Sequence, residues 1–182
     1  GVEQIFGCTD GDHVSLFHLD RPATIAPGDT TLELLMHGIA PAVVDRLLAG
    51  SDETGAVRSR LGLDDLLDGF TWDDHFGEAR GYALNAVAGR RYATLHVRPR
   101  PHGASASFEL GWDFSPEQAN ACLEHLLGVF APARADLLYF TAPVRLGFLP
   151  EGFTPHRITD AVLGDGYHVV YCHLERAPGN SG

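Results

Sequence analysis

Three short runs in the middle of the sequence constrain the fold of this chain most strongly. They cover residues 82–87, 92–98 and 104–110, and Gly89 and Gly103 lie in the connections between them. Alternation of apolar and polar residues places one side of each run in a core, and short glycine-bearing connections join neighbouring antiparallel strands. The sequence therefore predicts a three-stranded antiparallel meander in this region.

Further strands are predicted on both sides of the meander. Residues 2–6 and 13–19 flank a turn-forming segment near the start of the chain, which indicates a β-hairpin. Towards the end of the chain, three more runs have the composition of strands, at residues 137–141, 157–163 and 167–174.

Two helices are predicted between the hairpin and the meander. The apolar residues Leu32, Leu35 and Met36 have the spacing of one helical face, and Asp29 precedes them as a candidate N-cap. A second helix is expected to follow Pro41, with short helical turns continuing after it.

The start of another helix is marked at Ser115. Ser115 can cap the helix, Pro116 suits its first position, and Gln118 completes a capping box. Strands and helices in this order, without a repeat, predict an α+β layer in which helices cover one face of an antiparallel sheet. We expect one domain over residues 1–182, with a disordered tail from about residue 177.

Such a layer leaves one face of the sheet without helices. If that face is apolar, a second sheet should pack on it. The second sheet can come from an identical chain or from a different one, so we expect a homodimer or a heterodimer.

Charge and composition exclude several classes of function. The chain has 24 acidic and 13 basic residues, so its surface should repel nucleic acid and acidic membranes. No apolar run approaches the roughly 18 residues that a membrane helix needs. The three cysteines lack the close pairs of a zinc or redox site, and no histidine pair has metal-ligand spacing. We therefore expect a cytoplasmic protein that binds no nucleic acid, membrane or metal.

The run over residues 92–98 carries candidate chemistry. Alternate residues share one face of a strand, so His96, Arg98 and Arg100 should project together. Arginine presents paired donors to a carboxylate or phosphate, and histidine exchanges protons near neutral pH. This face is a candidate for binding an anionic group and for acid–base catalysis. The alternative is a solvated strand face whose charge the many acidic residues of the chain neutralise.

Three stretches together resemble a known family. They are residues 27–36 (PGDTTLELLM), 81–85 (GYALN) and 92–99 (YATLHVRP), the last continuing to residues 106–109 (ASFE). Their order and spacing resemble the carboxy-terminal half of the eukaryotic-type S-adenosylmethionine decarboxylases, and the likeness extends from the first hairpin to about residue 175. The resemblance implies half of an αββα sandwich, in which two similar halves pack sheet against sheet.

The resemblance also bears on the cofactor. Members of the family cleave themselves at a Glu-Ser pair in the other half, and the new serine end becomes a pyruvoyl group that accepts electrons during decarboxylation. This sequence contains no Glu-Ser dipeptide. We therefore expect that the chain makes no pyruvoyl cofactor itself and that a partner chain would have to supply it.

The resemblance places several site residues on this sequence. The processing serine and the catalytic histidine of the family match Ala83 and His96, so the hydroxyl is lost and the imidazole is kept. A glutamate that holds the ribose matches Arg100, which reverses the charge. The aromatic residue that stacks on adenine matches Phe76 if the alignment shifts by one residue, and Gly77 if it does not. The resemblance thus implies His96 as a catalytic residue, with Phe76 and Arg100 among the ligand contacts.

The polar residues that bind an activating diamine in animal-type members have counterparts in this chain, at Asp29, Thr31, Glu33 and Glu109. Carboxylates that converge inside a protein repel one another and lose hydration, so they need a cation, a basic side chain or protonation. Putrescine would serve as that cation. The alternative is that these are acids at a helix N-terminus and at a strand end, in contact with water and arginine.

Three functions fit this sequence. The first is an S-adenosylmethionine decarboxylase-like protein of polyamine metabolism that binds an adenosylmethionine-like ligand, is not self-sufficient for pyruvoyl-dependent decarboxylation and is completed by a partner chain. The second is a pyruvoyl-free lyase, cyclase or transferase that acts on adenosylmethionine or an anionic relative, with His96 as the base. The third is a non-catalytic activator or binding module.

Overall fold

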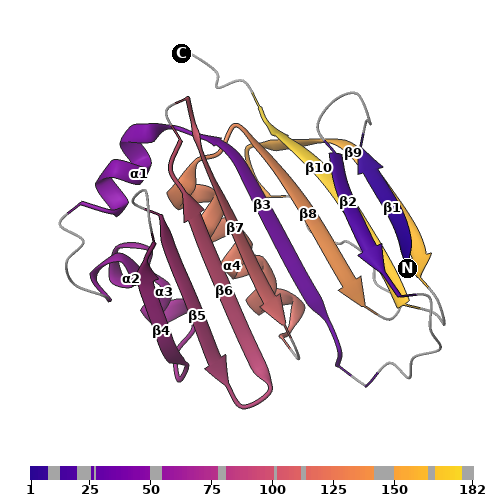
Figure 1. Ribbon diagram of the computed structural model, residues 1–182, viewed down its shortest axis with the longest axis horizontal. Coiled ribbons are helices and arrows are strands. Elements are labelled where there is room, and N and C mark those ends of the chain that lie inside the picture. Colours follow the sequence, from indigo (N-terminus) through magenta and orange to yellow (C-terminus); the bar gives the residue numbers. More distant parts are fainter. Residues whose placement is uncertain are drawn as a thin grey trace.

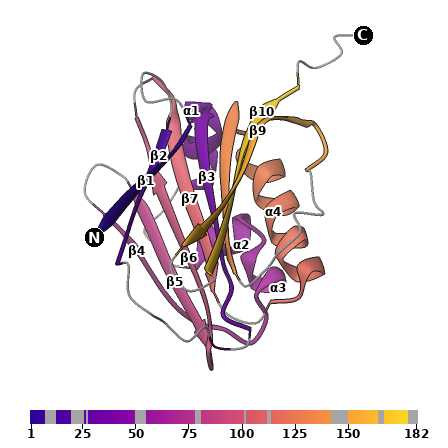
Figure 2. The same ribbon diagram turned by 90° about the vertical axis from the view of Figure 1, so that its right-hand side faces the viewer.

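The computed structural model describes residues 1–7, 13–19, 26, 28–49, 55–77, 81–100, 102–111, 114–141, 150–163 and 167–177. Within these residues, the body of the molecule is an antiparallel β-sheet with a two-stranded hairpin on one face and helices on the other (Figure 1, Figure 2). The predicted α+β layer is therefore confirmed. The predicted tail lies almost wholly outside the described residues.

The predicted strands are present, with small shifts in their ends. The hairpin consists of β1 (Val2–Gly7) and β2 (His13–His18). The meander consists of β5 (Tyr82–Ala88), β6 (Arg91–Arg98) and β7 (Ala104–Gly111). The three later strands are β8 (Arg134–Thr141), β9 (Phe153–Leu163) and β10 (Tyr167–Arg176).

A strand stands where the first helix was predicted. This strand, β3 (Thr31–Ile39), pairs with β7 on one side and with β8 on the other. Its side chains at Leu32, Leu34 and Met36 alternate into the core, whereas the helical pattern required Leu35 there. The run fits both periods, and pairing on two sides satisfies the backbone better than an isolated helix of this length would. The helix prediction was wrong for this reason.

One strand was not predicted from the sequence. It is β4 (Thr71–Phe76), which pairs with β5 and completes an eight-stranded sheet of order β4-β5-β6-β7-β3-β8-β10-β9. The polar residues Asp73, Asp74 and His75 hide its alternation. Because β4 lies at an edge, charged side chains are tolerated there and oppose pairing with another chain.

The helices cover one face of the sheet (Figure 2). They are α1 (Pro41–Leu47), α2 (Ala56–Arg60), α3 (Leu63–Leu66) and α4 (Pro116–Phe130). The predicted capping box of α4 is confirmed: Ser115 Oγ accepts from the Gln118 N–H, and Gln118 Oε1 accepts from the Ser115 N–H. Among the helices of the described residues, none is long and apolar enough to cross a membrane.

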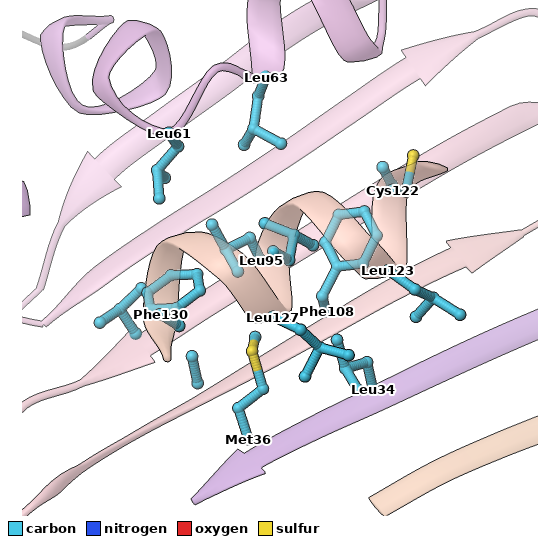
Figure 3. Close-up of a cluster of buried hydrophobic side chains, with 14 of the residues drawn as sticks. Leu34, Met36, Leu61, Leu63, Leu95, Phe108, Cys122, Leu123, Leu127 and Phe130 are labelled. Atoms are coloured by element: carbon cyan, nitrogen blue, oxygen red, sulfur yellow. The ribbon is translucent and has the colours of Figure 1, made fainter. Parts of the chain in front are cut away.

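The main hydrophobic core lies between these helices and the sheet (Figure 3). Leu127 and Phe130 of α4 meet Met36 of β3, Phe108 of β7 and Leu95 of β6, and all five side chains are buried. Each buried side chain of this size contributes roughly 1.5–3 kcal/mol to folding. Because one set of side chains of each strand is buried in this core, the alternate side chains project from the opposite face of the sheet.

The opposite face of the sheet is covered by the hairpin over part of its width (Figure 1). Phe6 of β1 is buried in a second core cluster with Leu138, Val169 and Tyr171 of the sheet, and its ring centroid lies 5.5 Å from that of Tyr171. Most of the apolar part of this face is therefore already occupied by the chain itself.

The rest of that face carries mostly small and polar side chains, with Val87 of β5 as an exposed apolar exception, and is not covered by another element of the described residues. It includes the outward side chains of β4 to β7 together with those at the start of β3, and we call it the open face. Its outward residues on β4 to β7 include Thr71, Asp73, His75, Ala83, Asn85, Thr94, His96, Arg98, Ser105 and Ser107.

Candidate ligand-binding site

Two carboxylates meet on the open face. Glu33 of β3 lies directly opposite Glu109 of β7 in the strand register, and both side chains are half-buried. Burial raises the pKa of Glu33, and the negative charge of Glu109 raises it further. Two carboxyl groups in this arrangement favour a bound cation or a retained proton.

Tyr92 of β6 joins this pair. Its Oη donates a hydrogen bond to Glu109 Oε1 at 2.5 Å, and the side chain of Thr31 hydrogen-bonds to Tyr92. Burial and then the hydrogen bond to Glu109 raise the pKa of Tyr92 to about 12, so the phenol stays a donor at neutral pH. The ring can lie across β7 because its register partner there is Gly111, where any Cβ atom would overlap the ring.

Asp29 and Tyr167 extend the site from two other segments. Asp29 precedes β3, Tyr167 begins β10, and a hydrogen bond joins their side chains. Burial and then the charge of Asp29 raise the pKa of Tyr167. We call the complete set the acidic cluster; its members are Asp29, Thr31, Glu33, Tyr92, Glu109 and Tyr167.

The position of the acidic cluster corrects one alternative drawn from the sequence. Its residues sit on strands and beside a strand, because Thr31 opens β3 and not a helix. A helix dipole is therefore not available to hold these acids ionised. Among the ion pairs between described residues, none involves Glu33 or Glu109.

His96 lies on the open face of β6, with Ala83 of β5 and Ser107 of β7 as its register partners. Within the described residues its imidazole forms no hydrogen bond or ion pair, so both ring nitrogens can serve a ligand. Arg98 projects from the same face two residues later. Arg100 lies beyond the end of β6, so the prediction that three cations share one strand face holds only for His96 and Arg98.

The structure does not bring Phe76 together with His96. Phe76 is the register partner of Tyr82, which is buried under the helices, and the two ring centroids are 5.4 Å apart. The Phe76 side chain therefore lies on the helix side of the edge strand β4. Contact between Phe76 and a ligand on the open face stays a prediction, and it requires the ligand to reach around that edge.

The tyrosines of the acidic cluster were missed in the sequence. Tyr92 lies on the same face of β6 as His96, and this spacing was a usable signal in the sequence. Its contact with Glu109, however, depends on Gly111, its register partner on β7. Tyr167 comes from the far end of the chain, and only the β8–β10 pairing brings it near Asp29. In the part of the chain that the structure describes, no three histidine, cysteine or acidic side chains are arranged to hold a metal ion.

Comparison with known proteins gives consistent matches. The sequence profile described as adenosylmethionine decarboxylase matches residues 2–146. The S-adenosylmethionine decarboxylase proenzyme of Leishmania donovani is 35% identical over an alignment of 155 residues that covers 79% of this chain and 39% of that protein. The corresponding proenzyme of Trypanosoma brucei brucei is 29% identical over an alignment of 176 residues that covers 92% of this chain and 42% of that protein. The chain therefore spans about two fifths of the length of these relatives.

A solved structure has the same fold. The crystal structure of the Trypanosoma brucei AdoMetDC-delta26 monomer matches with a TM-score of 0.70 at 22% identity, over 97% of this chain and 73% of that chain. The predicted architecture, an antiparallel sheet backed by helices as in half of an αββα sandwich, is thus confirmed at the level of the fold.

Proposed function

This chain belongs to the adenosylmethionine decarboxylase family, and on that basis we propose that it binds an adenosylmethionine-like ligand on its open face. The observation that carries the proposal is the acidic cluster, which is assembled on the same face as His96. The proposal has three parts: a cation site, a ligand site beside it, and a partner chain that completes the protein for decarboxylation.

The cation site is the acidic cluster, and its proposed ligand is a diamine such as putrescine. Glu33 and Glu109 face each other without an ion pair to any described basic residue, and Asp29 adds a third carboxylate nearby. Two ammonium groups joined by a short apolar chain would satisfy these carboxylates at separate points. Binding would relieve the repulsion between Glu33 and Glu109, so the diamine should also stabilise the fold.

The ligand site uses the cations of the open face. Arg98 can hold a carboxylate group of the ligand through paired donors, and Arg100 offers a second guanidinium just beyond β6. His96 can accept or donate a proton beside them. The outward neighbours Asn85, Thr94 and Ser107 add hydrogen-bonding groups to this surface.

The residues of this chain do not fit the formation of a pyruvoyl group. Its 182 residues contain no Glu-Ser dipeptide, and Ala83 stands beside His96 where the resemblance expects a serine. Pyruvoyl-dependent decarboxylation would therefore need a cofactor formed outside these 182 residues, and the source we propose is a partner chain.

The outer side of the hairpin supports contact with such a partner. Ile5 and Phe17 lie on the side of the hairpin that faces away from the sheet, and Phe17 is 73% exposed. Leu19, directly after β2, is also exposed. Large apolar side chains gathered on one surface are typical of a protein–protein contact. A homodimer and a heterodimer both remain within the proposal.

A calorimetric titration with putrescine tests the cation site. Wild-type protein should bind putrescine at about pH 8, and Glu109→Gln should weaken binding at least about tenfold, because a charge-assisted hydrogen bond is lost. Asp73→Asn is the matched control, since it removes an exposed carboxylate from β4 of the same face. Absence of binding by the wild type, or equal weakening by both variants, contradicts the cation site.

Release of carbon dioxide tests completion by a partner. The chain would be mixed with a pyruvoyl-bearing homologue, such as the Leishmania donovani enzyme, and supplied with adenosylmethionine. We expect a higher rate than the homologue gives alone, and His96→Ala should reduce the gain. A rate equal to that of the homologue alone contradicts this part of the proposal without touching the cation site.

A second candidate function is favoured by the unengaged imidazole of His96. The sulfonium of adenosylmethionine is already an activated leaving group, so elimination or cyclisation needs a positioned base and no electron sink. In this alternative the chain is a pyruvoyl-free lyase, cyclase or transferase. Incubation of the pure chain with adenosylmethionine should then yield methylthioadenosine, and unchanged substrate would remove the alternative.

A further inference from the structure

A second polar cluster lies on the hairpin side of the sheet, at the opposite end of β3 and β8 from the acidic cluster. Its centre is Asp136 of β8, whose register partner on β10 is His173. On β3, His37 belongs to this cluster, and the nearest member of the acidic cluster is Glu33. Four residues of strand separate them, which is about 13 Å at roughly 3.3 Å per residue. The second cluster is therefore separate from the ligand site proposed above.

Asp136 is only 5% exposed and is surrounded by donors. Its Oδ1 accepts hydrogen bonds from Tyr171 Oη and from His173 Nδ1, both at 2.7 Å, and its Oδ2 lies 3.4 Å from His37 Nε2. Burial by itself raises the pKa of this carboxyl, but the hydrogen bonds from His37, His173 and Tyr171 outweigh burial and hold the pKa below its usual range. Asp136 is therefore a fixed negative charge at neutral pH.

The contact with Asp136 orients His173. Because Nδ1 carries the hydrogen that Asp136 accepts, Nε2 lies on the other side of the ring, 3.9 Å from Oε1 of Glu175. Glu175 also engages a second ring, because its Oε2 lies 3.1 Å from His156 Nε2. The centroids of the two imidazoles are 6.4 Å apart. Two rings thus share one exposed carboxylate.

These rings line a pocket of about 310 Å³, together with Arg134, Arg157 and the end of β1. Arg157 Nη1 donates a hydrogen bond to the carbonyl oxygen of Gly7 at 2.8 Å, which ties β1 to β9 at the rim of the pocket. The lining contains two guanidinium groups and two imidazoles against a single carboxylate, that of Glu175. Asp136 lies behind His173 and is not part of the lining.

Two arginines and two histidines in one pocket contrast with the rest of the molecule, because the chain as a whole carries a net charge of −11. We propose that the pocket binds a small oxyanion, a phosphate or carboxylate group of a ligand, between Arg134, Arg157 and the rings of His156 and His173. Arginine matches such groups with paired donors, and protonated histidine adds charge. Glu175 competes with the anion for both rings.

Binding should depend on pH in a defined direction. The two rings are faced by groups from four strands, namely His37, Arg134, Asp136, Arg157, Tyr171 and Glu175. Histidine as a residue type gains its positive charge between about pH 8 and 5, so the pocket should bind an anion more tightly as the pH falls. Sulfate is a suitable probe because it keeps its double negative charge over this range, whereas phosphate does not.

Titration with sulfate tests the proposal, followed through the ring signals of the histidines in NMR spectra and through thermal unfolding. We expect saturable binding at about pH 6 that weakens at about pH 8. Arg134→Gln should weaken binding at least about tenfold through loss of a charge-assisted hydrogen bond, whereas Glu175→Gln should strengthen it several-fold. Arg46→Gln, in the last turn of α1 on the helix side, should leave the affinity unchanged.

The Glu175→Gln variant keeps the test decisive if Arg134→Gln does not fold, because the Glu175 side chain is exposed. Absence of saturable binding by the wild type overturns the proposal. So does an equal affinity in folded Arg134→Gln and Arg46→Gln, or weaker binding by Glu175→Gln than by the wild type.

Discussion

At the scale of single residues, the acidic cluster depends on a tyrosine and a glycine as much as on its acids. Tyr92 donates to Glu109, and its ring crosses β7 only because Gly111 has no side chain. The hydrogen bond from Tyr92 takes up one lone pair of Glu109 and leaves the other oxygen positions for a cation. Two uncharged residues, Tyr92 and Gly111, therefore determine how the carboxylate of Glu109 is oriented beside that of Glu33.

Gly111→Ala tests this arrangement. The added Cβ overlaps the Tyr92 ring, so the ring must move and its hydrogen bond to Glu109 must break. We expect a loss of roughly 1–3 kcal/mol in the free energy of unfolding, measured with urea. Gly128→Ala on α4 is the control, because its Cβ meets nothing and alanine should stabilise a helix by up to about 1 kcal/mol. Equal effects of the two changes would contradict the packing argument.

The raised pKa of Glu33 gives a prediction about pH. A carboxyl whose pKa is higher in the folded than in the unfolded state stabilises the fold when protonated, and this contribution is lost as the pH rises through the folded-state pKa. Ionised Glu33, half-buried beside Glu109, therefore opposes folding at neutral pH.

Glu33→Gln should consequently raise the melting temperature at about pH 8 and change it less at about pH 4. Putrescine should raise the melting temperature of the wild type at about pH 8 more than that of Glu33→Gln. Differential scanning calorimetry measures both effects. A lower melting temperature of Glu33→Gln at about pH 8 would show that Glu33 does not carry the repulsion.

At the scale of elements, the β1–β2 hairpin takes the place of part of a second layer. It buries Phe6 against the sheet between Leu138 and Tyr171 and leaves Phe17 on its outer side. A two-stranded hairpin alone is marginally stable in water, so its position depends on this packing. The contact with the sheet decides which part of the face stays open to a ligand.

Phe6→Ala should therefore destabilise the chain far more than Phe17→Ala does. We expect a loss of roughly 3–5 kcal/mol for the buried ring and under about 0.5 kcal/mol for the exposed one. Urea unfolding of the dilute, unassociated chain measures both. If the two variants lose equal stability, the hairpin does not pack as described.

Much of this element pattern could be predicted from the sequence, and the exceptions have physical causes. The meander and the capped helix at Ser115 carry local signals, alternation and capping, that agree with their tertiary environment. In β3, the run around Leu34 fits two periods, and pairing with β7 and β8 decides between them. Edge strand β4 lacks an apolar face that is continuous enough to be recognised.

The site could be predicted only in part, because its contacts depend on pairing between strands that are distant in the sequence. Glu33 and Glu109 were identified through a resemblance, but their direct opposition follows from the β3–β7 register, which the predicted helix would have prevented. The Asp136 cluster draws on three strands that are far apart in the sequence, and its histidines have no characteristic spacing. Contacts that depend on pairing across the sheet leave little local trace.

At the scale of the whole molecule, one sheet separates two environments. The helix side holds the main core, while the other side presents a hairpin, an acidic cluster near one end and a cationic pocket near the other. Because the core on the helix side stabilises the fold, the other side can carry charged groups that do not contribute to folding. The account depends most on the claim that the acidic cluster holds a diamine.

A crystal structure of the chain with putrescine measures that claim most directly. The account predicts one ammonium group of the diamine between the carboxylates of Glu33 and Glu109, with Tyr92 still donating to Glu109. A saturated crystal with putrescine elsewhere, or with an arginine of a neighbouring segment occupying the space between these two carboxylates, would contradict it.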